Sequence, residues 1–391
     1  KKKQTKKTFL QAARLDFNKA IKEESIFQYA KLAYELNATN EALITLKKFI
    51  VDYPKSQYYN EANEILADIF LITKNYDEAM QIIENLPQVS TKLQNSYQQM
   101  AYLKALSLYN DKKMDEADAI FNKALKYTNN KSYEALTYYW KADIAYQKSD
   151  YTKSKQLVDK FLSLNKNVVA ADANTANEGT AYYLKGYNYY KEKDYPNAAE
   201  QFSKSLNGLK NNTSSNINQT IYPDALLRLA DAYFIQKQYN NADVNYDIVI
   251  KNNYQGADYA LYQKSIIDGL SGKYNDKIAG MSALATRFPN SSFADDALFQ
   301  AGNTQFSLSK SADAKQTFNT LLQKYPKSDR VPETYIKLGL IEYNNNNYDE
   351  ALNWYKKVVE KYPNTPNANE ALLAIKDIYI EKGDANAYIK Y

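Results

Sequence analysis

Two landmark positions recur together nine times along the chain, and this repetition constrains the fold more than any other feature. The first, the small landmark, is Ala30, Ala67, Ala105, Ala142, Gly186, Ala230, Ser265, Gly302 and Gly339. The second landmark, twelve residues later, is Ala42, Ala79, Ala117, Ser154, Ala198, Ala242, Lys277, Ala314 and Ala351. A large apolar position follows four residues after that: Leu46, Ile83, Phe121, Val158, Phe202, Tyr246, Met281, Phe318 and Tyr355.

The two landmarks mark the two halves of a helical hairpin. Around each of them apolar residues recur at i, i+3, i+4 and i+7, and a short polar turn separates the two runs. Small residues are needed where two helices approach closely, and large ones fill the space beside them. The 391 residues include only 10 Gly and 9 Pro, too few to punctuate many strands. We therefore predict an all-α fold, an α-solenoid of antiparallel helix hairpins.

A proline motif separates successive hairpins. "YPKS" from Tyr53, "FPNS" from Phe288, "YPKS" from Tyr325 and "YPNT" from Tyr362 each follow the second run of a repeat. Proline ends that helix because it lacks an N–H and pushes the preceding residue out of the α region. The Ser, Asp or Asn that follows can cap the next helix.

These features resemble the tetratricopeptide repeat over residues 24 to 363, including "YDEA" at the turn before Ala79 and Ala351. The resemblance implies a right-handed superhelix of about nine full repeats and a non-enzymatic scaffold that binds a protein or peptide. The "YPKS" and "FPNS" endings are similar, more narrowly, to tetratricopeptide domains of bacterial envelope proteins such as the outer-membrane assembly lipoproteins and the Tol-Pal coordinator family. That similarity implies a periplasmic or outer-membrane-associated role in envelope assembly, with a cytoplasmic location as the alternative.

We divide the chain into three parts. Residues 1–23 are a basic start with one helix of a preceding partial repeat, in which Ala13, Phe17 and Ala20 follow the second-helix pattern. Residues 24–366 form nine repeats in one continuous solenoid, and residues 367–391 form an incomplete tenth. Because a solenoid needs polar capping units, the interrupted ends suggest a segment cut from a longer chain.

Two regions depart from the regular spacing. Landmarks lie 44 residues apart on either side of Ala198, and the extra length falls in residues 167–179 and 211–219, which we predict to be surface loops. The seventh repeat has Lys277 at the second landmark, Asp268 and Gly269 late in its first helix, and Gly280 in its second. We hypothesise a looser joint there, and the alternative is ordinary drift of the repeat.

The composition excludes most catalytic chemistry. With no Cys and no His, the chain has no disulfide, thiolate, or imidazole acid, base or metal ligand. It has no Gly-rich phosphate loop, EF-hand ladder or nucleophile elbow, and its carboxylate pairs are those of solvated helix faces. We therefore predict no catalytic residues, no cofactor, no metal and no enzymatic activity.

Charge and hydropathy narrow the partners. The net charge of +5 equals the contribution of Lys1, Lys2, Lys3, Lys6 and Lys7, so the rest of the chain is balanced and does not resemble a nucleic-acid binder. We interpret these lysines as a disordered start, with docking on an anionic membrane or an acidic partner as the alternative. No apolar run approaches the length of a membrane span.

The candidate binding surface comes from the resemblance, which implies that the first helix of each repeat lines a concave groove. Positions three before and four after the small landmark would point into it, and they are rich in aromatic residues in repeats three to five. The candidate partner-binding residues are Tyr102, Tyr109, Tyr139, Asp143, Tyr146, Tyr183, Tyr187, Tyr190, Asp231 and Phe234. Tyrosine suits recognition because it combines a large rigid area with a polar tip.

Other interpretations stay open for these residues. The rings can serve only to pack neighbouring helices, or exposed rings can stack on sugars in a glycan-binding module. Acidic positions such as Asp68, Asp143 and Asp231 favour a partner with basic side chains, or are simply solvated. The chain is expected to be a monomer or part of a larger complex. It can also be a regulatory region attached to an enzyme elsewhere in a longer protein.

Overall fold

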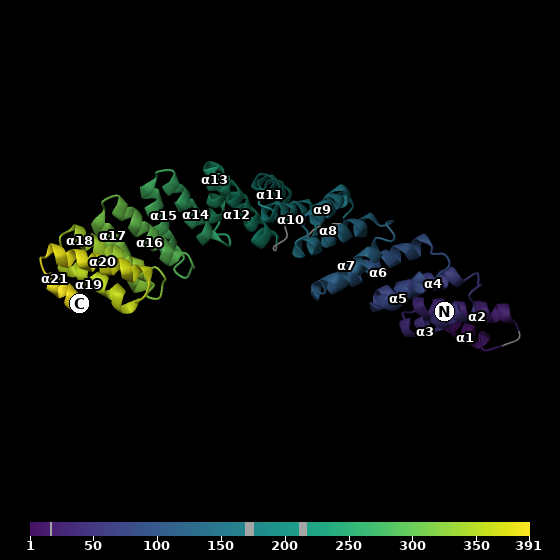
Figure 1. Ribbon diagram of the computed structural model, residues 1–391. Helices are drawn as coiled ribbons and strands as arrows, with labels where there is room; N and C mark the ends of the chain where they lie inside the picture. Colours follow the sequence, from purple (N-terminus) through teal and green to yellow (C-terminus); the bar gives the residue numbers. More distant parts are fainter. Residues whose placement is uncertain (16–17, 169–175, 211–216) are drawn as a thin grey trace. The chain divides into compact units, whose positions relative to one another are not determined.

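The computed structural model describes residues 1–15, 18–168, 176–210 and 217–391. The described residues form helices and no strand, which confirms the predicted all-α fold. They divide into two compact units (Figure 1), and each is described by itself. Unit 1 comprises residues 1–194 and 207–212, and unit 2 comprises residues 195–206 and 213–391. The expectation of one continuous solenoid over residues 24–366 stays a prediction.

The helices follow one another with short connections. Unit 1 contains α1 (Lys2–Ala12), α2 (Lys19–Glu35), α3 (Thr39–Asp52), α4 (Tyr59–Thr73), α5 (Tyr76–Glu84), α6 (Thr91–Asn110), α7 (Met114–Ala124), α8 (Lys131–Gln147), α9 (Tyr151–Leu164), the 3-10 turn η1 (Asn165–Asn167) and α10 (Glu178–Lys191). After α11 (Tyr195–Leu209), unit 2 contains the π-turn η3 (Ile217–Ile221), α12 (Tyr222–Ile235), α13 (Tyr239–Lys251), α14 (Ala257–Leu270), α15 (Tyr274–Arg287), α16 (Ala294–Ser307), α17 (Ser311–Lys324), α18 (Val331–Asn344), α19 (Tyr348–Lys361), α20 (Pro366–Glu381) and α21 (Ala385–Lys390).

Successive helices pair as hairpins, as the landmarks predict. Within each unit the first helix of a pair carries the small landmark and the second helix carries the second landmark. The glycine landmarks show why the position is small. A Cβ on Gly302 would lie 2.5 Å from Cε1 of Phe318, and one on Gly339 would lie 2.7 Å from Cε1 of Tyr355. Both rings stand at the large apolar position, so the small residue makes room for the ring of its own hairpin.

A left-handed residue ends the first helix of each hairpin. Its φ lies close to +60° at Asn37, Lys74, Lys112, Ser149, Lys193, Lys237, Ser309 and Asn346, and is +75° at Gly272. Each of these residues comes seven positions after its small landmark. This conformation turns the chain back toward the second helix, and it is accessible to residues other than glycine at a modest steric cost.

The proline junctions end one hairpin and begin the next. Helices α15 and α17 stop at Phe288 and Tyr325, whose φ values are −127° and −128°. In the following turn the Ser291 hydroxyl accepts a hydrogen bond from the N–H of Phe293 at 3.2 Å and donates one to Asp258 Oδ2 at 2.6 Å. Asp258 lies in α14, so the predicted cap also ties its turn to the preceding hairpin.

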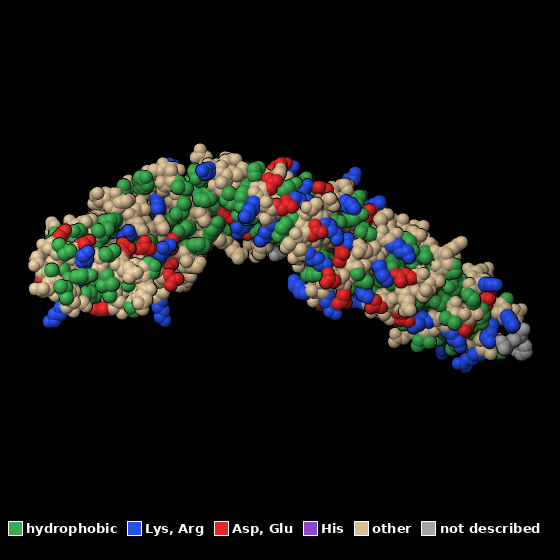
Figure 2. Space-filling model, in the orientation of Figure 1, with side chains coloured by type: hydrophobic (Ala, Val, Ile, Leu, Met, Phe, Trp, Pro, Cys, Tyr) green, Lys and Arg blue, Asp and Glu red, His purple; other side chains and the backbone are tan. Residues whose placement is uncertain are grey.

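Lysines directly before the small landmark join neighbouring hairpins by ion pairs. Within the described residues these pairs are Lys104 with Asp77, Lys141 with Asp118, Lys185 with Asp159 and Lys264 with Asp243. In each case the lysine lies in a first helix and the aspartate lies in the second helix of the previous hairpin. On the face drawn in Figure 2, acidic and basic side chains are interspersed, as the balanced composition predicts.

The start of the chain differs from the prediction. Residues 2–12 form α1, in which Lys2 pairs with Glu35 at 2.8 Å and Lys6 with Glu41 at 2.7 Å, so the interpretation as a disordered start is wrong. The predicted helix through Ala13 and Ala20 is also wrong. Helix α1 ends before Ala13, and Asn18 begins α2 by accepting hydrogen bonds from the next turn. The third residue of that pattern, Phe17, lies outside the described residues.

Most of the two predicted long loops lies outside the described residues, at 169–175 and 211–216. The described flanks are more ordered than expected of loops. Asn177 and Thr180 form a reciprocal capping box at the start of α10, and residues 217–221 form η3. The looser joint in the seventh repeat stays a prediction, which hydrogen exchange across α12 to α17 would test.

Candidate functional site

The predicted binding residues lie on four helices. In unit 1, α6 carries Tyr102 and Tyr109, α8 carries Tyr139, Asp143 and Tyr146, and α10 carries Tyr183, Tyr187 and Tyr190. Together with Trp140 we call these residues the tyrosine cluster. Residues three, four or seven positions apart share one face of a helix, which is how each helix presents its set on one side. Asp231 and Phe234 lie on α12 in unit 2.

Trp140 connects α8 to α6. Its ring centroid lies 4.9 Å from that of Tyr109 at an interplanar angle of 52°, and 5.2 Å from that of Tyr139 at 89°. The indole N–H donates a hydrogen bond to the hydroxyl of Tyr102 at 3.2 Å. Sequence reasoning missed Trp140 because it lies outside the two predicted columns. Its signal was that it is one of two tryptophans and directly follows a column position.

A hydrogen-bond network fixes the polar edge of the cluster. The Tyr109 hydroxyl donates to Asp143 Oδ2 at 2.5 Å, and Gln147 Nε2 donates to the Tyr109 hydroxyl at 3.1 Å and to Asp143 Oδ2. Burial, and then the charge of Asp143, raise the pKa of Tyr109. The hydroxyl therefore remains protonated and holds the half-buried carboxylate of Asp143 in place.

The rings of α8 and α10 meet edge to face. Tyr146 and Tyr187 lie 6.2 Å apart at 64°, and Tyr183 and Tyr187 lie 5.0 Å apart at 79°. Tyr139 packs against Phe161 at 5.2 Å, and burial raises the pKa of Tyr139 to about 12. These geometries are the tilted and T-shaped arrangements that aromatic pairs prefer.

Burial divides the cluster into an inner and an outer part. Tyr102 is only 5% exposed and belongs to the core of unit 1. The other predicted tyrosines are half-buried, so part of each ring remains at the surface. Packing between helices and presentation to a partner are thus both served by the same rings.

Asp231 in unit 2 has a different environment from the one predicted. It is 4% exposed and accepts hydrogen bonds from Arg228 at 2.6 Å, Tyr246 at 2.6 Å and Tyr259 at 2.9 Å. Burial raises the pKa of its carboxyl group. Asp231 therefore stabilises unit 2 from inside instead of presenting a carboxylate at the surface. Phe234 is half-buried against Tyr239, with ring centroids 5.8 Å apart.

Two searches for other kinds of site gave nothing within the described ranges. No group of three or more acidic side chains there is arranged to hold a metal ion. No helix in that part of the chain is both long and apolar enough to cross a bilayer.

Family models described as tetratricopeptide repeat match residues 24–56, 98–131, 296–328 and 332–365. The chain is a tetratricopeptide repeat protein. The matched segments correspond to the hairpins α2/α3, α6/α7, α16/α17 and α18/α19. The other hairpins carry the same landmarks. Tetratricopeptide repeats form scaffolds for protein–protein interaction.

Solved structures with similar folds include three repeat proteins. YrrB, described as a TPR protein with an unusual peptide-binding site, is 20% identical, with 53% of this chain and 93% of YrrB covered and a TM-score of 0.40. The apo form of RapI is 15% identical, with coverage of 93% and 99% and a TM-score of 0.43. PilF of Pseudomonas aeruginosa is 17% identical, with coverage of 54% and 88% and a TM-score of 0.37. No curated protein matches the chain.

Proposed function

We propose that this tetratricopeptide repeat protein is a non-enzymatic scaffold that binds a peptide or protein segment over the tyrosine cluster of unit 1. The observation that carries the proposal is the concentration of half-buried tyrosines on α6, α8 and α10. Such rings offer a partner a large contact area at a small entropic cost, with hydroxyl groups for hydrogen bonds.

The ring geometry supports a polypeptide ligand over a sugar. A sugar ring stacks on an exposed flat aromatic face, whereas the rings here pack against one another at 52° to 89°. Their exposed parts alternate with the carboxylate of Asp143, which suits a segment that carries both apolar and basic side chains. The proposed ligand is therefore an extended or helical segment with a basic residue near Asp143.

We further propose that the protein acts in bacterial envelope assembly, in the periplasm or at the outer membrane. The proposal is supported by the "YPKS" and "FPNS" junctions and by the absence of cysteine. Fractionation of the native organism, with antibodies against this chain, is expected to recover it with periplasmic or outer-membrane markers. Recovery with cytoplasmic markers alone would contradict the envelope role and leave the scaffold proposal intact.

The binding proposal is tested by removing two rings that contact each other across helices. Tyr146→Ala/Tyr187→Ala is expected to reduce recovery of the partner about tenfold or more in affinity capture, because truncating buried aromatic contacts at an interface typically costs about 2 kcal/mol. The captured proteins are identified by mass spectrometry, and far-ultraviolet circular dichroism confirms that the variant stays helical.

The matched control is Tyr379→Ala/Tyr388→Ala, a ring pair 6.4 Å apart on α20 and α21, outside the cluster. It is expected to retain the partner. If the control loses the partner and Tyr146→Ala/Tyr187→Ala keeps it, binding occurs elsewhere and the tyrosine cluster only packs helices.

A further inference from the structure

The seventh repeat departs from the pattern at two positions that meet in space. Four residues after its small landmark it has Gly269, where the other repeats carry Tyr34, Leu71, Tyr109, Tyr146, Tyr190, Phe234, Phe306 and Tyr343. At the second landmark it has Lys277, where the others carry alanine or serine. A Cβ on Gly269 would lie 2.8 Å from Cδ of Lys277, so the lysine stem runs over the glycine.

The missing side chain leaves a tyrosine without the ring that covers its equivalents. In other hairpins the ring at this position contacts the tyrosine three residues before the second landmark, with centroids 5.8 Å apart for Tyr146 and Tyr151 and 5.6 Å apart for Tyr343 and Tyr348. The equivalent residue in the seventh repeat is Tyr274, which is 47% exposed.

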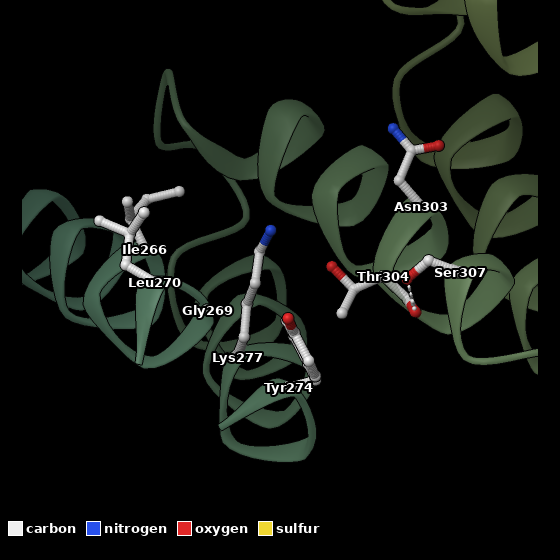
Figure 3. A pocket seen from close by; sticks show the side chains of 8 residues that line it. All are labelled: Ile266, Gly269, Leu270, Tyr274, Lys277, Asn303, Thr304 and Ser307. Carbon is white, nitrogen blue, oxygen red and sulfur yellow. Dashed lines mark hydrogen bonds between the residues drawn. The ribbon is translucent and has the colours of Figure 1, made fainter. Parts of the chain in front are cut away.

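The space becomes an open pocket of about 410 Å³ within unit 2 (Figure 3). Ile266 and Leu270 of α14 form an apolar wall, Asn303 and Thr304 of α16 form a polar wall, and Tyr274 and Lys277 rise from α15 between them. A pocket with one apolar side, one polar side and a single cation suits a ligand with the same division.

The ammonium group of Lys277 has no acidic partner in the part of the chain that the structure describes. Its printed contact is a 3.3 Å hydrogen bond to Gln300 Oε1, and burial lowers its pKa. The acidic group that acts on it electrostatically is Asp296, which already pairs with Arg330 at 2.5 Å. A partly buried cation without a counter-ion costs free energy, which an incoming anion would recover.

We propose that this pocket receives one acidic side chain of a bound polypeptide. The carboxylate pairs with the ammonium of Lys277, and the residues that flank it in the ligand rest on Ile266 and Leu270. The inference rests on the proposed function only in that its ligand is a polypeptide. The pocket lies in unit 2 and the tyrosine cluster lies in unit 1, so the failure of one is measurable without the other.

The test is fluorescence anisotropy of the full chain with three dye-labelled peptides. The first is acetyl-Ala-Leu-Glu-Leu-Ala-amide, the second has Gln in place of Glu, and the third has Gln and a free terminal carboxylate. We expect the Glu peptide to bind about tenfold more tightly than both others, as one charge-assisted contact allows. Equal affinity for the Glu and Gln peptides would overturn the proposal. Preference for the free terminal carboxylate would overturn the assignment to a side chain.

Two variants localise the effect. Lys277→Met keeps the stem and removes the charge, so the Glu and Gln peptides are expected to bind equally and at the wild-type affinity for Gln. Gly269→Tyr restores the ring of the other repeats and fills the pocket, so both peptides are expected to weaken. A full Glu preference in either variant would overturn the proposal. Tyr146→Ala/Tyr187→Ala, measured with the same peptides, is expected to keep the preference unchanged.

Discussion

Phe318→Ala is expected to lower the free energy of unfolding of unit 2 by about 3 to 5 kcal/mol, the usual cost of truncating a buried phenylalanine. Phe318 is fully buried, fills the space above Gly302 and lies 6.0 Å from the ring of Phe299. Alanine would leave a cavity between two backbones that are already close. Urea denaturation followed by circular dichroism at 222 nm, with about 3 kcal/mol as the smallest expected loss, measures it.

Two further variants separate cavity formation from a general loss of apolar area. Val244→Ala truncates an exposed side chain and is expected to change stability by less than about 0.5 kcal/mol. Gly302→Ala places a Cβ 2.5 Å from the Phe318 ring and is expected to cost about 1 to 3 kcal/mol by overpacking. A loss below about 1 kcal/mol for Phe318→Ala would contradict the pairing of small landmark and large position.

Asp118→Ala is expected to cost about 3 kcal/mol because it leaves a buried cation without its counter-ion. The partner, Lys141, is 5% exposed, lies 2.5 Å from Asp118 Oδ1 and 2.8 Å from Asn122 Oδ1, and joins α8 to α7. Burial already lowers the pKa of Lys141, even with Asp118 present. Denaturation at pH 7 measures the loss.

The pH dependence and a double variant test the cause. A lysine whose folded pKa is depressed destabilises the fold while it is charged in the unfolded chain, so the deficit of Asp118→Ala is expected to shrink as the pH rises toward about 10.5. Asp118→Ala/Lys141→Met removes the buried charge and is expected to recover most of the loss at pH 7. A double variant as unstable as the single one would show that Asp118 acts through packing.

The sequence predicted the repeated architecture well because the same contact is written many times. Gly302 opposite Phe318 and Gly339 opposite Tyr355 are recognisable from a fixed spacing of small and large residues. Features that occur once gave no such signal. Helix α1 depends on Lys2 and Lys6 finding acidic partners on later helices, which local spacing does not encode.

Burial was the other quantity that spacing could not supply. Asp231 and Asp143 stand at equivalent positions, one residue after the small landmark, but only Asp231 is enclosed, by Tyr246 and Tyr259. The pocket in the seventh repeat was visible in the sequence only as two irregular residues. The structure shows that Gly269 and Lys277 touch, which changes an apparent weakness of the repeat into a candidate binding site.

The central claim, that a partner binds over the tyrosine cluster, is tested most directly by site-specific photo-crosslinking in cells. p-Benzoylphenylalanine replaces Tyr146 in one variant and Tyr388, a ring outside the cluster on α21, in another. The proposal predicts a discrete crosslinked product at position 146, identified by mass spectrometry, and none at position 388. The same product at position 388 with none at position 146 would contradict it.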